Sequence, residues 1–177
     1  MGFHKIIASL DESELSQQVF RQALDLAKVY QSELLLLHVV PALDPAMSTG
    51  ADVFMGGMSD LGSYPIFANP ELWEAQRQAL QDHARAWLVQ YVEQAHSTGV
   101  KVQWRCAVGE AGAAICEVAE SLQADLVVIG RRGLSGLAEV FAGSVSNEVV
   151  HHAPCSVLVV QATSSEETLS PAVGSNP

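Results

Sequence analysis

The chain has few basic residues, few cysteines and no long hydrophobic segment. Nine Lys and Arg residues stand against twenty Asp and Glu residues, which gives a formal net charge of −11 over 177 residues. A surface this acidic disfavours general attraction to nucleic acid or to an anionic membrane. We therefore expect neither as a partner, and an anionic ligand would have to be held by local groups.

No stretch approaches the roughly 18 apolar residues that a membrane-spanning helix needs, and the first residues lack the apolar segment of a signal peptide. The three cysteines, Cys106, Cys116 and Cys155, form no Cys-x-x-Cys pair and cannot all pair within one chain. Free thiols fit a reducing compartment. These features predict a cytoplasmic protein without a membrane span.

Two common phosphate-binding motifs are also missing. No Gly-Lys-Ser or Gly-Lys-Thr follows the glycines, and no Gly-x-Gly-x-x-Gly follows the first predicted strand. The missing loop lysine and the lack of an evident residue to position water argue against rapid hydrolysis. We assign no catalytic residue and no metal ligand, because His151, His152 and Cys155 alone fit roles in packing and at a helix end better.

Strand-like and helix-like segments alternate along the chain. Short apolar runs or period-two patterns predict strands over residues 4–10, 33–40, 100–108, 125–129 and 156–160. Apolar residues at helical spacing predict helices over residues 14–30, 71–97, 110–122 and 144–152, the first of them capped by Ser13. The alternation predicts an α/β fold with a parallel sheet, and the half-polar pattern of 100–108 indicates an edge strand.

The length and an apolar content of 49% predict one domain over residues 1–161. Residues 41–70 hold four prolines, four glycines and three methionines without a clear period, so we expect a long loop or lid. Residues 162–177 are rich in Ser, Glu, Thr, Pro and Gly, which predicts a disordered tail.

A glycine-bearing segment follows the buried strand at 125–129. It contains Gly130, Gly133, Gly143 and Ser144, and a helical pattern begins at its end. Glycines let a ligand approach the backbone, and a helix N-terminus offers unpaired N–H groups, so the segment predicts an anion site, with phosphate the usual anion. Arg131 and Arg132 would offset some of the negative charge. The alternatives are a loop that only turns the chain and arginines that only face solvent.

The spacing Gly-x2-Gly-x9-Gly-Ser resembles the nucleotide-binding signature of the universal stress protein family, in its ATP-binding subgroup. The similarity extends to Ile6–Asp11, Leu36–Val39 and Ala153–Val160, and so covers roughly residues 4 to 160. The resemblance implies an open five-stranded parallel sheet of order 3-2-1-4-5 with helices on both faces. This is the Rossmann-like fold of the adenine nucleotide alpha hydrolase type.

The resemblance also implies a ligand, which is ATP or another adenine nucleotide, with or without Mg. Asp11 would lie beside the adenine and ribose, and the backbone of Val39 would meet the base. The alternatives are a helix-capping role for Asp11 and ordinary core packing for Val39. The full set implied to bind nucleotide is Asp11, Val39, Gly130, Arg131, Arg132, Gly133, Gly143, Ser144 and Val145.

The function that follows is a nucleotide-responsive sensor or regulatory module in the stress response, acting on an unidentified protein partner. A slow ATP hydrolase or nucleotidyl-transfer enzyme, and a regulator that responds to AMP or cyclic AMP, are the alternatives. The last strand is apolar and expected at a sheet edge, where exposed strands invite pairing. Together with the resemblance it predicts a homodimer through Val157, Leu158, Val159 and Val160, unless the C-terminal tail covers that edge.

Overall fold

A computed structural model of the protein describes residues 2–42, 70–131 and 143–161, and in these ranges strands and helices alternate strictly. The strands are β1 (Lys5–Ser9), β2 (Glu33–Val40), β3 (Val102–Val108), β4 (Leu126–Arg131) and β5 (Ser156–Gln161). The helices are α1 (Ser16–Tyr30), α2 (Pro70–His96), α3 (Ala111–Leu122) and α4 (Ser144–His152). Most of the predicted loop, residues 43–69, and the predicted tail, residues 162–177, lie outside the described ranges.

The five strands form one parallel sheet of order β3-β2-β1-β4-β5, which confirms the predicted fold class and strand order. Strand β1 is central, and its Ile7 pairs with Leu35 of β2 on one side and with Val127 of β4 on the other. Strands β3 and β5 lie at the two edges, as predicted. Because the chain runs from β1 to β2 on one side and later reaches β4 on the other, the connections change direction between β1 and β4.

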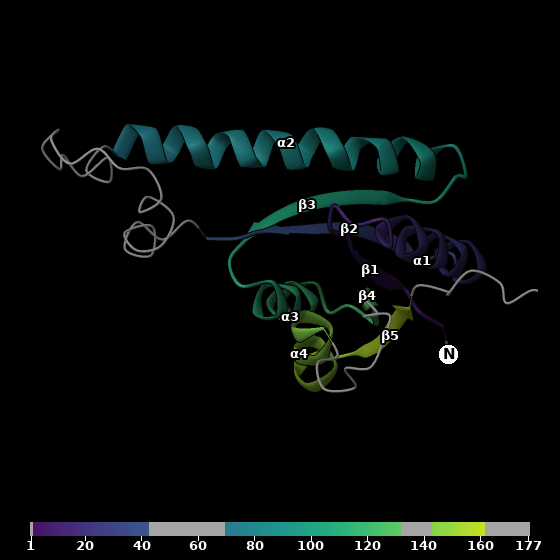
Figure 1. Ribbon diagram of the computed structural model, residues 1–177. Helices are drawn as coiled ribbons and strands as arrows, with labels where there is room; N and C mark the ends of the chain where they lie inside the picture. The colour runs from purple at the N-terminus through teal and green to yellow at the C-terminus, as the bar shows by residue number, and fades with distance from the viewer. Residues whose placement is uncertain (1, 43–69, 132–142, 162–177) are drawn as a thin grey trace, which may run out of the picture.

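Helices cover both faces of the sheet, with α1 and α2 on one side and α3 and α4 on the other (Figure 1). Neighbouring residues of a strand point to opposite faces, so Ile6 packs in the core under α1 and α2 while Ile7 packs in the core under α3 and α4. Both side chains are 1% exposed. This is why the central strands are apolar at nearly every position, as strands covered on both faces must be.

The start of α1 differs from the prediction. The helix begins at Ser16 rather than Glu14, its N-cap is Leu15, and no side chain caps it. Ser13 accepts a hydrogen bond from the Ser16 N–H through its backbone carbonyl, at 3.1 Å, and its hydroxyl is donated to Asp11 instead. The predicted capping role of Ser13 is therefore wrong, because the helix begins three residues later, where Leu15 occupies the N-cap position and has no side-chain acceptor.

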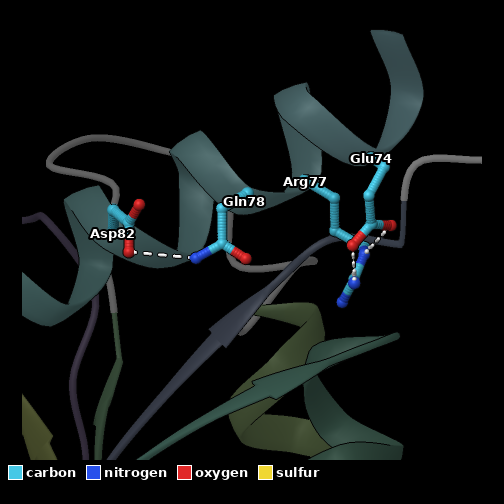
Figure 2. Close-up of polar contacts among 4 residues, drawn as sticks. All are labelled: Glu74, Arg77, Gln78 and Asp82. Atoms are coloured by element: carbon cyan, nitrogen blue, oxygen red, sulfur yellow. Dashed lines mark hydrogen bonds and ion pairs between the residues drawn. The ribbon is translucent and has the colours of Figure 1, made fainter. Parts of the chain in front are cut away.

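Helix α2 runs past the sheet at its N-terminal end (Figure 1), and residues there are held by contacts within the helix. Arg77 Nε donates to Glu74 Oε2 at 3.0 Å, and Gln78 Nε2 donates to Asp82 Oδ1 at 3.1 Å (Figure 2). Both pairs have the spacing at which side chains of a helix meet. The hydrogen bond from Arg77 lowers the pKa of the Glu74 carboxyl. None of the helices in the described ranges is both long and apolar enough to cross a membrane.

Candidate functional site

A cleft of about 400 Å³ opens at the carboxyl ends of β1 and β4, where the connections change direction. This is the position at which open α/β sheets bind their ligands. The cleft is bordered by the end of β1, the start of α1, the end of β2, the start of α3, the end of β4 and the start of α4. The residues that line it are Ser9, Leu10, Asp11, Ser13, Leu15, Ser16, Val19, Val39, Ala111, Ile115, Ile129, Gly130, Gly143, Ser144, Val145 and Ser146.

Asp11 lies two residues after the end of β1, and hydrogen bonds from its neighbours hold its carboxylate. Its Oδ1 accepts hydrogen bonds from the Ser13 N–H at 3.0 Å, from the Ser13 hydroxyl, and from the Ser16 hydroxyl at 2.9 Å. The Asp11 N–H donates to Ser16 Oγ at 2.8 Å. The carboxylate thus organises the turn between β1 and α1 and lies on the wall of the cleft.

Helix α2 contributes a buried tyrosine, Tyr91, whose hydroxyl is influenced by the charge of Asp11. Burial raises the pKa of the Tyr91 hydroxyl, and the negative charge of Asp11 raises it further. The Tyr91 ring also packs edge to face against Phe20 of α1 and Trp87 of α2, with ring centroids 5.0 Å apart in each case. These ring contacts pack α2 against α1 on this face of the sheet.

Gly130 belongs to β4 rather than to the loop in which the sequence placed it. Gly130 pairs with Val160 and Arg131 pairs with Gln161, so the strand continues two residues beyond Ile129. A methyl group on Gly130 would lie 2.8 Å from Leu15 Cδ2 and 3.3 Å from Val19 Cγ2. The physical reason for a glycine here is thus the close packing of α1 on the end of β4.

Helix α4 begins at the cleft. Its N-cap is Gly143, and Gly143, Ser144 and Val145 all line the cavity, as does the next residue, Ser146. The first N–H groups of a helix have no acceptor within the helix and carry the positive end of its dipole. Neither Lys nor Arg occurs among the described residues that line the cleft. An anion there would be held by these N–H groups and by hydroxyls.

The structure brings together most of the residues that the sequence singled out. Asp11, Val39, Gly130, Gly143, Ser144 and Val145 line one cavity. Arg131 ends β4 opposite Gln161 and does not line the described part of the cleft. Arg132 and Gly133 lie outside the described residues, so their predicted role stays a prediction.

Two buried serine hydroxyls and helix α3 also border the cleft, and the sequence analysis did not single them out. Ser16 is 2% exposed and Ser146 is 4% exposed, and both line the cavity together with Ala111 and Ile115 of α3. The spacing Asp11-x-Ser13 is a signal that was available, because an aspartate often accepts a hydrogen bond from the N–H two residues later. No comparable sequence pattern marks Ser146, whose hydroxyl donates to the Gly143 carbonyl at 3.0 Å.

Two histidines, in β2 and at the C-terminal end of α4, make contacts with backbone carbonyls. His38 is 8% exposed, and its Nδ1 lies 2.9 Å from the Leu10 carbonyl, directly before Asp11. His152 Nδ1 lies 2.9 Å from the Glu148 carbonyl, one turn earlier in α4. Within the described residues, no group of three or more His, Cys, Asp or Glu side chains is arranged to hold a metal ion.

The sheet order and the position of the cleft define an α/β protein of the Rossmann-like class, with a site at the carboxyl ends of β1 and β4. Residues 2–161 match the model of the universal stress protein family, and the chain belongs to that family. The universal stress protein Sll1388 of Synechocystis is 40% identical over 167 residues, which span 91% of this chain and 99% of the relative.

Solved structures share the fold. A universal stress protein in complex with cAMP superposes with a TM-score of 0.62 at 20% identity, over 91% of this chain and 98% of that one. A universal stress protein family protein from Arabidopsis thaliana, with AMP bound, gives a TM-score of 0.57 at 20% identity, over 89% of this chain and 91% of that one. These likenesses confirm the predicted adenine nucleotide alpha hydrolase type of fold.

Proposed function

We propose that this chain binds an adenine nucleotide in the cleft between β1, β4 and α4, with ATP as the expected ligand, and acts as a regulatory module of the stress response. The observation that carries the proposal is that two kinds of group line the same cavity. The start of α4 supplies N–H donors and the Ser144 hydroxyl for phosphates, while Asp11 and Val39 supply acceptors for a base or a sugar.

The chemistry of the cleft suits a phosphate ester. Hydrogen bonds from N–H groups to a charged phosphate contribute roughly 1.5–3 kcal/mol each, so a few of them replace a basic residue. Asp11 lies at the β1 side of the same cavity as Gly143 and Ser144. Because a carboxylate repels phosphate, we expect the phosphates at α4 and the nucleoside at Asp11. Arg131, Arg132 and Gly133 complete the proposed site from the end of β4 and the segment after it.

Two members of the same fold support the choice of an adenine nucleotide, since one was solved with cAMP and the other with AMP. Neither result fixes the number of phosphates for this chain. Our choice of ATP, with or without Mg, comes from the resemblance of Gly-x2-Gly-x9-Gly-Ser to the ATP-binding subgroup. The alternative within the proposal is a regulator that responds to AMP or cyclic AMP.

The proposal includes a homodimer through β5. This strand lies at a sheet edge, and Val157, Leu158 and Val159 are partly exposed there, whereas Val160 is 2% exposed and contributes only its backbone. An open apolar edge favours pairing with a second copy. We place the module, one domain over residues 1–161, in the cytoplasm, where its free cysteines would stay reduced.

The test has two stages. First, mass spectrometry of the small molecules that the purified chain releases on denaturation identifies a retained nucleotide. Second, calorimetric titration of the stripped chain with ATP, ADP, AMP and cAMP, with and without Mg, ranks them. The proposal expects Ser144→Ala and Gly143→Val to weaken binding of the preferred nucleotide, and absence of binding by all four would contradict it.

A further inference from the structure

The first residue of α1 is a buried serine, Ser16, whose side chain makes two hydrogen bonds to Asp11. We propose that Ser16 is a positioning residue, which holds the Asp11 carboxylate in the orientation that the nucleotide meets. The inference rests on the proposed function and adds to it a residue that the sequence did not single out.

The direction of the hydrogen bonds around Ser16 is fixed by the donors present. The Asp11 N–H can only donate, so Ser16 Oγ accepts from it, at 2.8 Å. A carboxylate oxygen only accepts, so the single hydroxyl proton of Ser16 is donated to Asp11 Oδ1, at 2.9 Å. That proton is thus committed to Asp11. Ser16 lines the cleft, but its hydroxyl acts on a ligand through Asp11.

Ser16 and Ser13 together fix one oxygen of the carboxylate. Oδ1 accepts from the Ser16 hydroxyl, the Ser13 hydroxyl and the Ser13 N–H, which are three donors on a single atom. Hydrogen bonds to an ionised acceptor are about twice as strong as neutral ones. A carboxylate held in this way has a fixed plane, so it loses less conformational freedom when a ligand binds.

Of the two serines that bond to the Asp11 carboxylate, Ser16 is held more firmly than Ser13 by its position in the fold. It is the first residue of α1 and is 2% exposed, whereas Ser13 lies on the turn and is half-buried. Ser16 also makes a reciprocal pair of hydrogen bonds, because it accepts from the Asp11 backbone and donates to the Asp11 side chain. The first residue of α1 therefore holds both the backbone N–H and the carboxylate of Asp11.

A positioning role differs from a purely structural one in its dependence on Asp11. If Ser16 acts through the carboxylate, removing its hydroxyl costs affinity only while the carboxylate is present. If Ser16 only stabilises the fold, the cost is the same with or without Asp11. A double-mutant cycle on nucleotide affinity separates the two, since residues that act through one another show non-additive effects.

The experiment titrates ATP, or whichever of ADP, AMP and cAMP the unmodified chain binds most tightly, into Ser16→Ala, Asp11→Ala and the double variant. We expect Ser16→Ala to weaken binding about tenfold in the unmodified background and less than about twofold in the Asp11→Ala background. Ser32→Ala is the matched control, because Ser32 is 3% exposed, donates its hydroxyl to the Phe3 carbonyl and lies before β2, away from the cleft. The control should bind nucleotide as the unmodified chain does.

A tenfold loss that persists without the carboxylate, or no loss in Ser16→Ala, would overturn the positioning role. If Asp11→Ala binds too weakly to be titrated, the crystal structure of Ser16→Ala decides: a rotated Asp11 carboxylate supports the role, and an unmoved one refutes it. Absence of nucleotide binding by the unmodified chain is a separate result, seen before any variant is made. It would overturn the proposed function, and the positioning role with it.

Discussion

Replacing Gly130 with alanine should destabilise the fold through α1 rather than through the strand. A methyl group at this position would lie 2.8 Å from Leu15 Cδ2, 3.2 Å from Leu15 Cγ and 3.3 Å from Val19 Cγ2. Val19 is 1% exposed and cannot move away easily. Inserting a methylene group into a packed core costs typically about 1–3 kcal/mol, and the smaller backbone entropy of alanine returns about 0.5–1 kcal/mol.

The net expectation is a loss of up to about 2.5 kcal/mol in the free energy of unfolding, measured by urea denaturation, and lower stability than the control variant. Gly143→Ala is the matched control, because within the described ranges a methyl group there would meet only Ser146 Oγ, at an ordinary 3.4 Å. The cost of Gly130→Ala should shrink in a Leu15→Ala background, where the tightest contact is absent. Equal stability of Gly130→Ala and the control, or an unchanged cost without the Leu15 side chain, would refute the packing explanation.

Three further predictions concern pH, thiol reactivity and assembly. The backbone N–H groups of Lys5 and His4 donate to the Asp125 carboxylate at 2.8 and 2.7 Å and lower its pKa in the folded chain. Asp125 therefore stabilises the fold at pH values above its unfolded pKa of about 4. This contribution is lost as the pH falls through the lower pKa of the folded state. Asp125→Asn should therefore cost about 1 kcal/mol in urea unfolding at neutral pH and little in acid, and a cost independent of pH would argue against this role. Burial raises the pKa of all three cysteine thiols, so alkylation by iodoacetamide at neutral pH should be slower in the folded chain than in urea, and equal rates would contradict the burial. Sedimentation velocity should show a dimer of the 18.9 kDa chain, and a monomer at all concentrations would rule out pairing through β5.

The fold could be predicted because its signals are local. Apolar runs such as Leu34–Leu37 identify buried strands, and their alternation with helical patterns indicates a parallel sheet. The strand order came from the family resemblance. The exact ends of elements were less predictable, as Gly130 shows: a glycine after an apolar run suggests the start of a loop, whereas the approach of α1 requires a glycine inside β4.

The site was predictable where backbone chemistry leaves a trace in the sequence. Glycines before a helix mark Gly143 and Ser144, and a carboxylate after the first strand marks Asp11. The role of Ser16 left no such trace, because its contact with Asp11 depends on how the chain turns into α1. The cleft wall formed by Ala111 and Ile115 depends on the packing of α3 against the sheet, which no local pattern encodes.

The measurement that tests the account most directly is calorimetric titration of the nucleotide-free chain with ATP and AMP, compared with Asp11→Ala and Ser144→Ala. The account predicts saturable binding at one site per chain that both substitutions weaken, since Asp11 and Ser144 line the same cleft. Binding that neither substitution affects would place the nucleotide elsewhere. No binding of ATP, ADP, AMP or cAMP would contradict the central claim that this cleft is a nucleotide site.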